Sequence, residues 1–436
     1  PRTAGGWCPV MAAFSTAWTA WSCSGRSYIA ICGPSPSPEP HWSATLQQPD
    51  IPARARRRVV LLGATGSIGR QACEIVAAHP DLFELVGVVA GHDAGALEAV
   101  VRRFGVPRSA VVDPAPGAVL PEGCATGLEA ACEIAALEAD VVCVGISGAA
   151  ALRPTLAALD AGTDVATATK EVLVMAGELV RARAAASGAT IIPVDSEHSA
   201  LWQCLRGEDP ASVRRLVLTA SGGPFRQRPL DTLSTVTVEE ALRHPNWSMG
   251  PKITVDSATM MNKGLEIIEA HFLFDMPYAR IDVVIHPPSV VHSCVEFCDG
   301  ATLAQLGLPD MRVPIALALS GGRRLEGVCA PVDLAAASPL EFQEVDPRRF
   351  PAVGLARRAG EAGGAAPCVL NAANEAAVAA FLGGGCRFDE IVSLVERTID
   401  AAPAPASPSL DELVALDAWA REEVGRGCAP ATGGRS

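Results

Sequence analysis

The hydrophobic positions after residue 56 follow two alternating patterns. Short apolar runs such as 59–62 and 85–90, bounded by glycine or polar residues, predict buried strands. Between such runs, apolar residues recur every three or four positions, which predicts amphipathic helices. Strands that alternate with helices favour a doubly wound, mostly parallel sheet over residues 56–188.

The pattern changes twice further along the chain. Residues 189–320 again mix predicted strands, such as 191–194 and 214–220, with helices, so we expect a second α/β domain. Residues 321–344 carry glycine and proline without periodicity and are interpreted as a linker. From 345 to 424 the apolar spacing is helical, which predicts a small all-helical C-terminal domain.

Residues 1–50 do not share these patterns. They carry four of the seven tryptophans, a Pro/Ser-rich run and no acidic residue before Glu39. A targeting peptide and a disordered or artefactual extension are both consistent with this composition. We favour the extension and expect the fold to begin near residue 56.

Composition narrows the classes of function. Hydrophobic residues make up 49% and charged residues 19% of the 436 positions, as in an ordered globular protein. The net charge of -13 argues against a general affinity for nucleic acid or an anionic membrane. No apolar run approaches the roughly 18 residues of a membrane helix. Fourteen cysteines without a CxxC pair indicate reduced thiols, so we expect a cytoplasmic protein and favour a plastid less.

A glycine-rich turn follows the first predicted strand. The three glycines of GATGSIG (63–69) have the spacing with which a dinucleotide fold turns tightly and approaches a pyrophosphate, although a plain turn would use the same residues. The next strand ends at Gly91, where an NAD-specific site usually has a carboxylate. The glycine leaves room for a 2′-phosphate with His92 as its partner, whereas Asp93 favours NAD. We expect NADP.

Residues that suit a metal ion lie in two stretches. Asp195 and Glu197 follow a predicted strand at i and i+2, so continued extended geometry would direct both carboxylates to one side. Taken alone, a DSE sequence is more often a helix cap or a solvated loop. If a helix starts near Asn262, then Asn262, Lys263 and Glu266 share one of its faces. Carboxylate oxygens favour Mg²⁺ or Mn²⁺.

Two further segments could contribute to the same site. Ser221 and the flexible Gly222-Gly223 backbone can surround a phosphate, unless they form only a turn. Lys170 and Glu171 lie at a predicted strand–helix junction, the end of a doubly wound sheet at which ligands bind. A solvent-exposed lysine at the end of a strand is the alternative there.

The stretch 244–254 predicts a loop that covers the site. Trp247 and Met249 stand there among prolines and a glycine, which suit a hinged loop better than a core element. Such a loop would shield reacting groups from water.

A zinc site is a weaker hypothesis. The candidate ligands alternate along one predicted strand and the turn before it: His286, His292, Cys294, Glu296 and Cys298. Their spacing matches no closed zinc motif, so we favour a strand whose polar face points inward or to an interface.

Seven motifs occur together in the order and approximate spacing of one known family. They are GATGSIG, TKEVLV, PVDSEHSALWQ, SGGPFR, HPNWSMGPKITVDSATMMNKGLEIIEA, IHPPSVVHS and LNAANEAAVAAF. From residue 56 to about 424 the sequence resembles the 1-deoxy-D-xylulose 5-phosphate reductoisomerase family. The resemblance implies a homodimer whose subunits have a Rossmann-like NADP-binding domain, an α/β catalytic domain and a helical C-terminal domain.

The resemblance also implies an activity and its cofactors. The expected enzyme uses NADPH and either Mg²⁺ or Mn²⁺. It isomerises and reduces a phosphorylated sugar, 1-deoxy-D-xylulose 5-phosphate, to 2-C-methyl-D-erythritol 4-phosphate in the non-mevalonate isoprenoid pathway.

The family motifs imply roles for individual residues. The metal ligands are Asp195, Glu197 and Glu266. The substrate-binding candidates are Lys170, Ser196, Glu197, Ser221, His244, Trp247, Ser257, Asn262, Lys263 and Glu266, among which Lys170, Glu197 and His244 are the catalytic candidates. The cofactor-binding candidates are Thr65, Gly66, Ser67, Ile68, Gly91, His92, Asp93, Thr169, Glu171 and Gly250.

Three places depart from the family pattern, and two other functions stay open. Thr169 stands where the family has Asn, His92-Asp93 where a basic or small residue precedes Asn, and Pro288 where it has Gln. An NAD(P)-dependent dehydrogenase of a phosphorylated polyol or semialdehyde would need no carboxylate triad. A cofactor-sensing binding protein would keep the fold without turnover.

Overall fold

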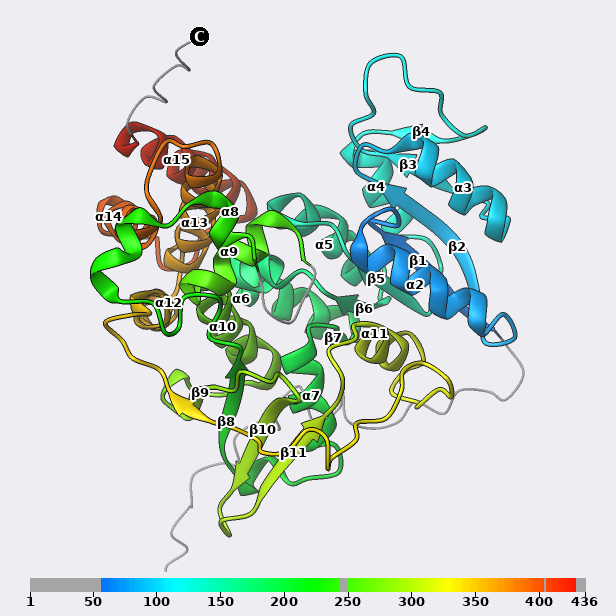
Figure 1. The fold of residues 1–436 in the computed structure, drawn as a ribbon. Helices are drawn as coiled ribbons and strands as arrows, with labels where there is room; N and C mark the ends of the chain where they lie inside the picture. Colours follow the sequence, from blue (N-terminus) through cyan, green and yellow to red (C-terminus); the bar gives the residue numbers. More distant parts are fainter. Residues whose placement is uncertain (1–55, 244–248, 404, 429–436) are drawn as a thin grey trace, which may run out of the picture. The chain divides into compact units, whose positions relative to one another are not determined.

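A seven-stranded sheet forms the first half of the fold (Figure 1). In this computed structural model, which describes residues 56–243, 249–403 and 405–428, the strand order is β4-β3-β2-β1-β5-β6-β7. All of its strand pairs are parallel. The chain runs outward from β1 in one direction and from β5 in the other, so the carboxyl ends of these two strands form the switch point at which such sheets bind ligands.

The elements of this half agree with the predicted alternation. The strands are β1 (Arg57–Leu62), β2 (Phe83–Ala90), β3 (Ser109–Val111), β4 (Ala125–Thr126), β5 (Val141–Val144), β6 (Asp164–Thr167) and β7 (Ile191–Pro193). The helices are α2 (Ser67–Ala78), α3 (Ala94–Phe104), α4 (Leu128–Ala135), α5 (Leu152–Asp160) and α6 (Lys170–Ser187). The central strands β1 and β5 are almost completely buried, as strands covered on both faces must be.

Two glycines explain the tight turn between β1 and α2. Gly63 has a φ of 90°, and a Cβ atom there would lie 2.6 Å from the Gly145 carbonyl oxygen. A Cβ atom on Gly69 would lie 2.2 Å from the Gly63 carbonyl oxygen. Any side chain at either position would force the turn apart, so the helix can begin directly beyond the end of the strand.

A mixed five-stranded sheet, in the order β11-β10-β8-β9-β12, follows. Its strands are β8 (Val213–Ala220), β9 (Ile281–Ile285), β10 (Val291–Phe297), β11 (Thr302–Leu306) and β12 (Gln343–Glu344). The helices of this part are α7 (Ser196–Leu205), α8 (Val238–Ala241), α9 (Pro251–Thr259), α10 (Met261–Phe274) and α11 (Arg312–Leu319). Helix α7 packs on β10 and β11, while α10 reaches across to α6 of the first half.

Four helices form the C-terminal part: α12 (Pro351–Ala362), α13 (Ala366–Leu382), α14 (Ile391–Ala401) and α15 (Leu410–Gly427). The apolar helix α13 packs against the other three and also contacts α6 (Figure 1, orange to red). The predicted fold class is confirmed: a Rossmann-like parallel sheet, a second mixed sheet and a helical C-terminal region. The domain boundaries at 188, 320 and 344 stay predictions.

At Asp195 the helix cap is confirmed and the extended geometry does not continue: Asp195 is the N-cap residue of α7, so Glu197 lies in the first helical turn. The expected end of the covering loop was wrong. Helix α9 begins at Pro251, because proline needs no hydrogen-bond acceptor in a first turn, so the predicted loop 244–254 ends at Gly250. Residues 244–248 of that loop, like residues 1–50, lie outside the described part of the chain.

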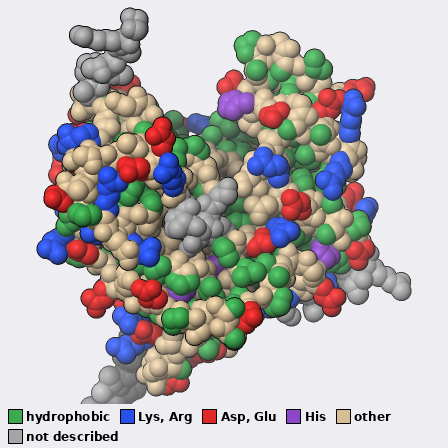
Figure 2. Space-filling model, viewed as in Figure 1, with side chains coloured by type: hydrophobic (Ala, Val, Ile, Leu, Met, Phe, Trp, Pro, Cys, Tyr) green, Lys and Arg blue, Asp and Glu red, His purple; other side chains and the backbone are tan. Residues whose placement is uncertain are grey.

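The surface offers no general attraction for anions. Acidic and basic side chains are interspersed on the face drawn in Figure 2. Among the described residues, every helix is too short or too polar to cross a membrane. With a net charge of -13, a phosphorylated ligand would depend on cationic groups gathered at its own site.

Candidate active site

A cavity of about 1100 Å³ is lined by residues from all three parts of the fold. The turn after β1 and the start of α6 contribute from the parallel sheet. The start of α7, the end of β8, and helices α9 and α10 contribute from the second part. Side chains of α13 and α15 complete the wall. The cavity therefore includes the sheet end at which the glycine turn would hold a dinucleotide.

Most of the predicted site residues line this cavity. They are Gly66, Ser67, Ile68, Thr169, Lys170, Glu171, Asp195, Ser196, Glu197, Ser221, Gly250, Ser257, Asn262, Lys263 and Glu266. Thr65, Gly91, His92 and Asp93 are not among the lining residues. His244 and Trp247 lie outside the described residues, so their predicted roles are untested.

Two buried lysines hold the three predicted metal ligands together. The Nζ atom of Lys170 pairs with Asp195 and lies 3.0 Å from Oε1 of Glu266. The Nζ atom of Lys263 pairs with Glu266 and lies 2.8 Å from Oε1 of Glu197. Glu266 is fully buried and is shared by both ammonium groups. Three carboxylates thus face two cations.

Burial and the facing charges together set the pKa values in this cluster. Burial raises the pKa of Asp195 and of Glu266, and the nearby Glu197 carboxylate adds to both increases. Burial would also raise the pKa of Glu197, but Lys263 holds it well below the usual range. Burial would lower the pKa of Lys170, but the facing carboxylates raise it. Such a set of hard oxygen donors suits a divalent cation.

Close packing of two backbones assembles the predicted phosphate site. Gly223 has a φ of 64°, and a Cβ atom there would lie 2.7 Å from the carbonyl oxygen of Ser257. The segment after β8 can therefore lie directly on α9, which brings Ser221 and Ser257 to the same cavity. Asn262 and Lys263 belong to the first turn of α10, whose N-terminus favours an anion.

Some of the predicted cofactor residues line the cavity, and the others do not. Thr169 lies in the cavity wall, and its hydroxyl donates to the carbonyl oxygen of Ile146 at 2.6 Å. Glu171 pairs with Lys252 there, at 2.9 Å between Oε1 and Nζ. The residues after β2 stand apart from the lining, and Asp93 serves as the N-cap of α3 by accepting from the Ala96 amide at 2.8 Å.

Asp93 therefore already has a structural partner that the sequence interpretation did not include. His92 lies beside it, and Nδ1 is 2.8 Å from the carbonyl oxygen of Asp113. A carbonyl oxygen only accepts, so Nδ1 carries the hydrogen of this bond. The remaining ring nitrogen can face a ligand.

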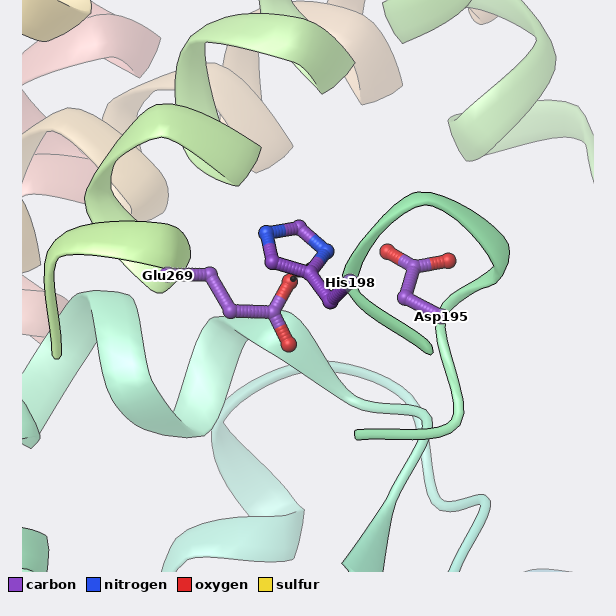
Figure 3. Close-up of side chains that lie close together, drawn as sticks. All are labelled: Asp195, His198 and Glu269. Atoms are coloured by element: carbon purple, nitrogen blue, oxygen red, sulfur yellow. Dashed lines mark ion pairs between the residues drawn. The ribbon is translucent and has the colours of Figure 1, made fainter. Parts of the chain in front are cut away.

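A second polar cluster lies behind the cavity wall (Figure 3). Potential ligand atoms of Asp195, His198 and Glu269 lie within 4.8 Å of one another. Nδ1 of His198 is 3.2 Å from Oε2 of Glu269, and both side chains are fully buried. Burial lowers the pKa of His198 to about 4, and burial together with Asp195 raises that of Glu269 well above its ordinary value. His198 and Glu269 do not line the cavity, whereas the predicted triad of Asp195, Glu197 and Glu266 does. A ligand in the cavity can therefore reach the triad.

Sequence reasoning missed several residues of the wall. Lys252 and Met311 line it, as do Glu375 and Arg421, which form an ion pair of 2.6 Å. The last two come from α13 and α15, far along the chain; Glu375 lies within the LNAANEAAVAAF motif, but no role was assigned to it, and Arg421 lies in none of the seven motifs. His292, considered only as a zinc ligand, lines this cavity instead.

Comparisons with known proteins agree with this arrangement. The model of 1-deoxy-D-xylulose 5-phosphate reductoisomerase matches residues 59–177, and two models of its C-terminal domain match 191–274 and 306–423. The enzyme of that name from Thermomicrobium roseum is 50% identical over 379 residues, covering 85% of this chain and 98% of the relative. The chain belongs to the 1-deoxy-D-xylulose 5-phosphate reductoisomerase family. A further reductoisomerase, from Chlorobium chlorochromatii, is 50% identical over 374 residues, 84% of this chain and 98% of the relative.

Solved reductoisomerase structures share the fold. That from Zymomonas mobilis in complex with NADPH has a TM-score of 0.79 and 41% identity, over 85% of this chain and 99% of that chain. A DOX-P reductoisomerase in complex with NADPH, fosmidomycin and magnesium has a TM-score of 0.77 and 38% identity, over 85% and 98%. The family predicted from the motifs is confirmed, while the roles of single residues in this reductoisomerase family member stay predictions.

Proposed function

We propose that the protein converts 1-deoxy-D-xylulose 5-phosphate to 2-C-methyl-D-erythritol 4-phosphate, with NADPH as reductant and Mg²⁺ or Mn²⁺ as metal. The observation that carries this proposal is the single cavity shared by a dinucleotide turn, a carboxylate triad and a set of phosphate donors. An ordinary dehydrogenase would need the first of these features without the second. Family membership and the ligands named for the solved relatives support the same activity.

We propose Asp195, Glu197 and Glu266 as the metal ligands. Burial, together with the neighbouring Glu197 carboxylate, raises the pKa of Asp195 and of Glu266, so a bound cation would stabilise their charged forms, and hard oxygen donors match Mg²⁺ and Mn²⁺. When bound, the cation would supply Lewis-acid polarisation of two adjacent substrate oxygens, and NADPH would supply the hydride.

The chain's own residues would orient the substrate from its two ends. Ser221, Ser257, Asn262 and Lys263 would hold the phosphate, and this remote binding energy would position the reacting carbons. The Lys170 ammonium group, fixed by two carboxylates, would donate to an oxygen on which negative charge develops. The branched aldehyde formed by the rearrangement must be reduced before it hydrates, so an enclosed cavity favours product formation.

Cofactor binding would use the glycine turn and the start of α6. Gly66, Ser67 and Ile68 would place backbone amides at the N-terminus of α2 against the pyrophosphate. Thr169, Glu171 and Gly250 line the same cavity and are proposed contacts to the remainder of NADPH.

We also propose a homodimer and a cytoplasmic location. Both proposals come from the family resemblance and from the cysteine usage. Each cysteine in the described part of the chain is a free thiol, as a reducing compartment requires.

A direct assay tests the proposed function. Purified protein is mixed with 1-deoxy-D-xylulose 5-phosphate, NADPH and Mg²⁺, and the decrease in NADPH absorbance is followed with and without EDTA. We expect turnover that stops with EDTA and returns when Mg²⁺ or Mn²⁺ is added in excess. Fosmidomycin, which is bound in a solved relative, should inhibit it.

Two results would contradict the proposal. Turnover that persists in EDTA would show that the carboxylate triad is not a metal site and would favour an ordinary dehydrogenase. Binding of NADPH without any turnover of the substrate would favour a cofactor-binding protein.

A further inference from the structure

The distribution of lysine singles out one residue without a role so far. The whole chain contains only three lysines, and its other cationic side chains are all arginines. All three lysines, at 170, 252 and 263, line the active-site cavity. Lys170 and Lys263 hold the carboxylate triad. Lys252 lies apart from that triad, at the end of the cavity next to Glu171.

Lys252 is the centre of a polar network that joins three helices. Its Nζ atom lies 2.9 Å from Oε1 of Glu171 on α6 and 3.0 Å from Oδ2 of Asp256, one turn further along α9. Oδ1 of Asp256 in turn accepts a hydrogen bond of 2.8 Å from the side-chain amide of Asn374 on α13. One ammonium group thus connects the three parts of the fold.

The network fixes the Glu171 carboxylate from one side. Asp256 is 1% exposed and Asn374 is fully buried, so the support on which Lys252 rests is rigidly packed. Glu171 itself has a side-chain exposure of 13%, and a carboxylate at that depth would cost free energy without a paired cation. Lys170, the residue before Glu171, is anchored in the triad. Two neighbouring residues therefore fix the first turn of α6: Lys170 through the triad and Glu171 through Lys252.

We propose that Lys252 is a positioning residue for the cofactor: its ammonium group fixes the Glu171 carboxylate at the dinucleotide end of the cavity. This inference rests on the proposed function, because it takes Glu171 as a contact to bound NADPH. A compact ammonium group can sit about 3 Å from two carboxylates at once, whereas a planar guanidinium is wider and demands a different geometry.

The test compares two variants of the full chain. Lys252→Met removes the charge and keeps most of the side-chain volume. Arg181→Met is the matched control, because Arg181 also lies on α6, pairs across to Asp275 at the end of α10 at 2.9 Å, and is 25% exposed against 30% for Lys252. Arg181 does not line the cavity.

NADPH binding without substrate is the decisive measurement. Titration followed by nucleotide fluorescence should give a Kd about tenfold higher for Lys252→Met and less than twofold higher for Arg181→Met. The KM for NADPH should rise in parallel, while the KM for the phosphorylated substrate stays within twofold. If Lys252 were purely structural, Lys252→Met would lower the thermal stability, as Arg181→Met does, and would change neither the Kd nor the KM for NADPH.

A double variant tests whether Lys252 acts through Glu171. Glu171→Gln alone should weaken NADPH binding, and adding Lys252→Met should weaken it little further, because the two changes remove one interaction. Independent effects that multiply would overturn the inference. An unchanged Kd for folded Lys252→Met would do so as well.

Two provisions keep the outcomes distinct. If Lys252→Met does not fold, Lys252→Arg keeps the charge, and it should still weaken NADPH binding about threefold; an unchanged Kd would overturn the inference. The unsubstituted protein is assayed first, and absence of substrate turnover there would count against the proposed function. Normal turnover of the unsubstituted protein, together with an unchanged Kd for NADPH in the Lys252 variants, would count only against the role of Lys252.

Discussion

Replacing Glu269 with Gln should change the way in which stability responds to pH. Nε2 of His198 lies 2.9 Å from the carbonyl oxygen of Glu266, which only accepts, so Nε2 carries a hydrogen. Nδ1 lies 3.2 Å from Oε2 of Glu269, both side chains are fully buried, and one titratable proton on this pair leaves it neutral overall. The lowered pKa of His198, about 4, and the raised pKa of Glu269 assign that proton to the carboxyl group. The folded pair therefore holds one titratable proton.

The magnitude follows from counting protons in the folded and unfolded chains. Unfolded Glu and His titrate near pH values of about 4.3 and about 6.5. Between those values the unfolded pair also holds one proton, so the pair makes no pH-dependent contribution. Above about 6.5 the unfolded pair holds none, so each pH unit lowers the stability by about 1.4 kcal/mol until the raised pKa of Glu269 is reached. The loss therefore grows with each pH unit for as long as the folded Glu269 carboxyl stays protonated.

The substitution Glu269→Gln reverses this dependence. It leaves an amide that can donate to Nδ1 of His198 but holds no titratable proton. Above pH 6.5 neither the folded nor the unfolded pair then binds a proton, and stability no longer falls. Below pH 6.5 the unfolded His198 binds a proton that the folded one does not, so stability falls by about 1.4 kcal/mol per unit as the pH decreases.

Urea denaturation at pH 5.5, 6.5, 7.5 and 8.5, in EDTA, measures the effect. The unfolding free energy of the unsubstituted protein minus that of Glu269→Gln should decrease by about 1.4 kcal/mol per pH unit for as long as the folded Glu269 carboxyl stays protonated. Glu396→Gln, at an exposed position on α14, is the control and should leave the slope unchanged. A difference that stays constant within about 0.5 kcal/mol would refute the assignment of a single shared proton.

Three other outcomes are expected. Glu266→Gln should abolish metal-dependent turnover but leave the Kd for NADPH, measured by fluorescence, within about twofold; retained turnover would contradict its assignment as a ligand. Lys263→Met should raise the KM for the phosphorylated substrate at least tenfold in steady-state assays, and an unchanged KM would remove it from the phosphate site. Gly177→Val should lower the unfolding free energy in urea by about 1–3 kcal/mol, because a Cβ atom at Gly177 would lie 2.3 Å from the ring of Phe272; unchanged stability would show that α6 and α10 can separate without cost.

The sequence alone determined the features that repeat over short distances. The order of strands and helices follows from apolar spacing, and the turn at 63–69 follows from glycines whose backbone geometry other residues cannot adopt. The shared face of Asn262, Lys263 and Glu266 also follows, because a helix brings residues three and four apart together. Where apolar residues were nearly continuous, as in α11 (Arg312–Leu319), periodicity gave no signal and the helix was missed.

Local spacing also could not decide the role of a residue that had two possible partners. Asp93 could have been a ribose ligand or a helix cap, and Asp195 could have extended a strand or started a helix. The cap at Asp93 was decided by the position of α3 relative to β2, which no neighbouring residue specifies. The first turn of α7 likewise fixed the direction of Glu197.

Only the tertiary structure decided which distant groups meet. Lys170 reaches Glu266 across 96 positions, and Lys252 reaches Glu171 across 81. The cavity wall formed by Glu375 and Arg421, and the pairing of His198 with Glu269, likewise join residues that lie far apart in the sequence. Such contacts depend on how the helices pack after the chain has folded back on itself. Helix packing depends on the whole surface of each helix. The periodicity of a sequence, by contrast, describes one helix or strand at a time.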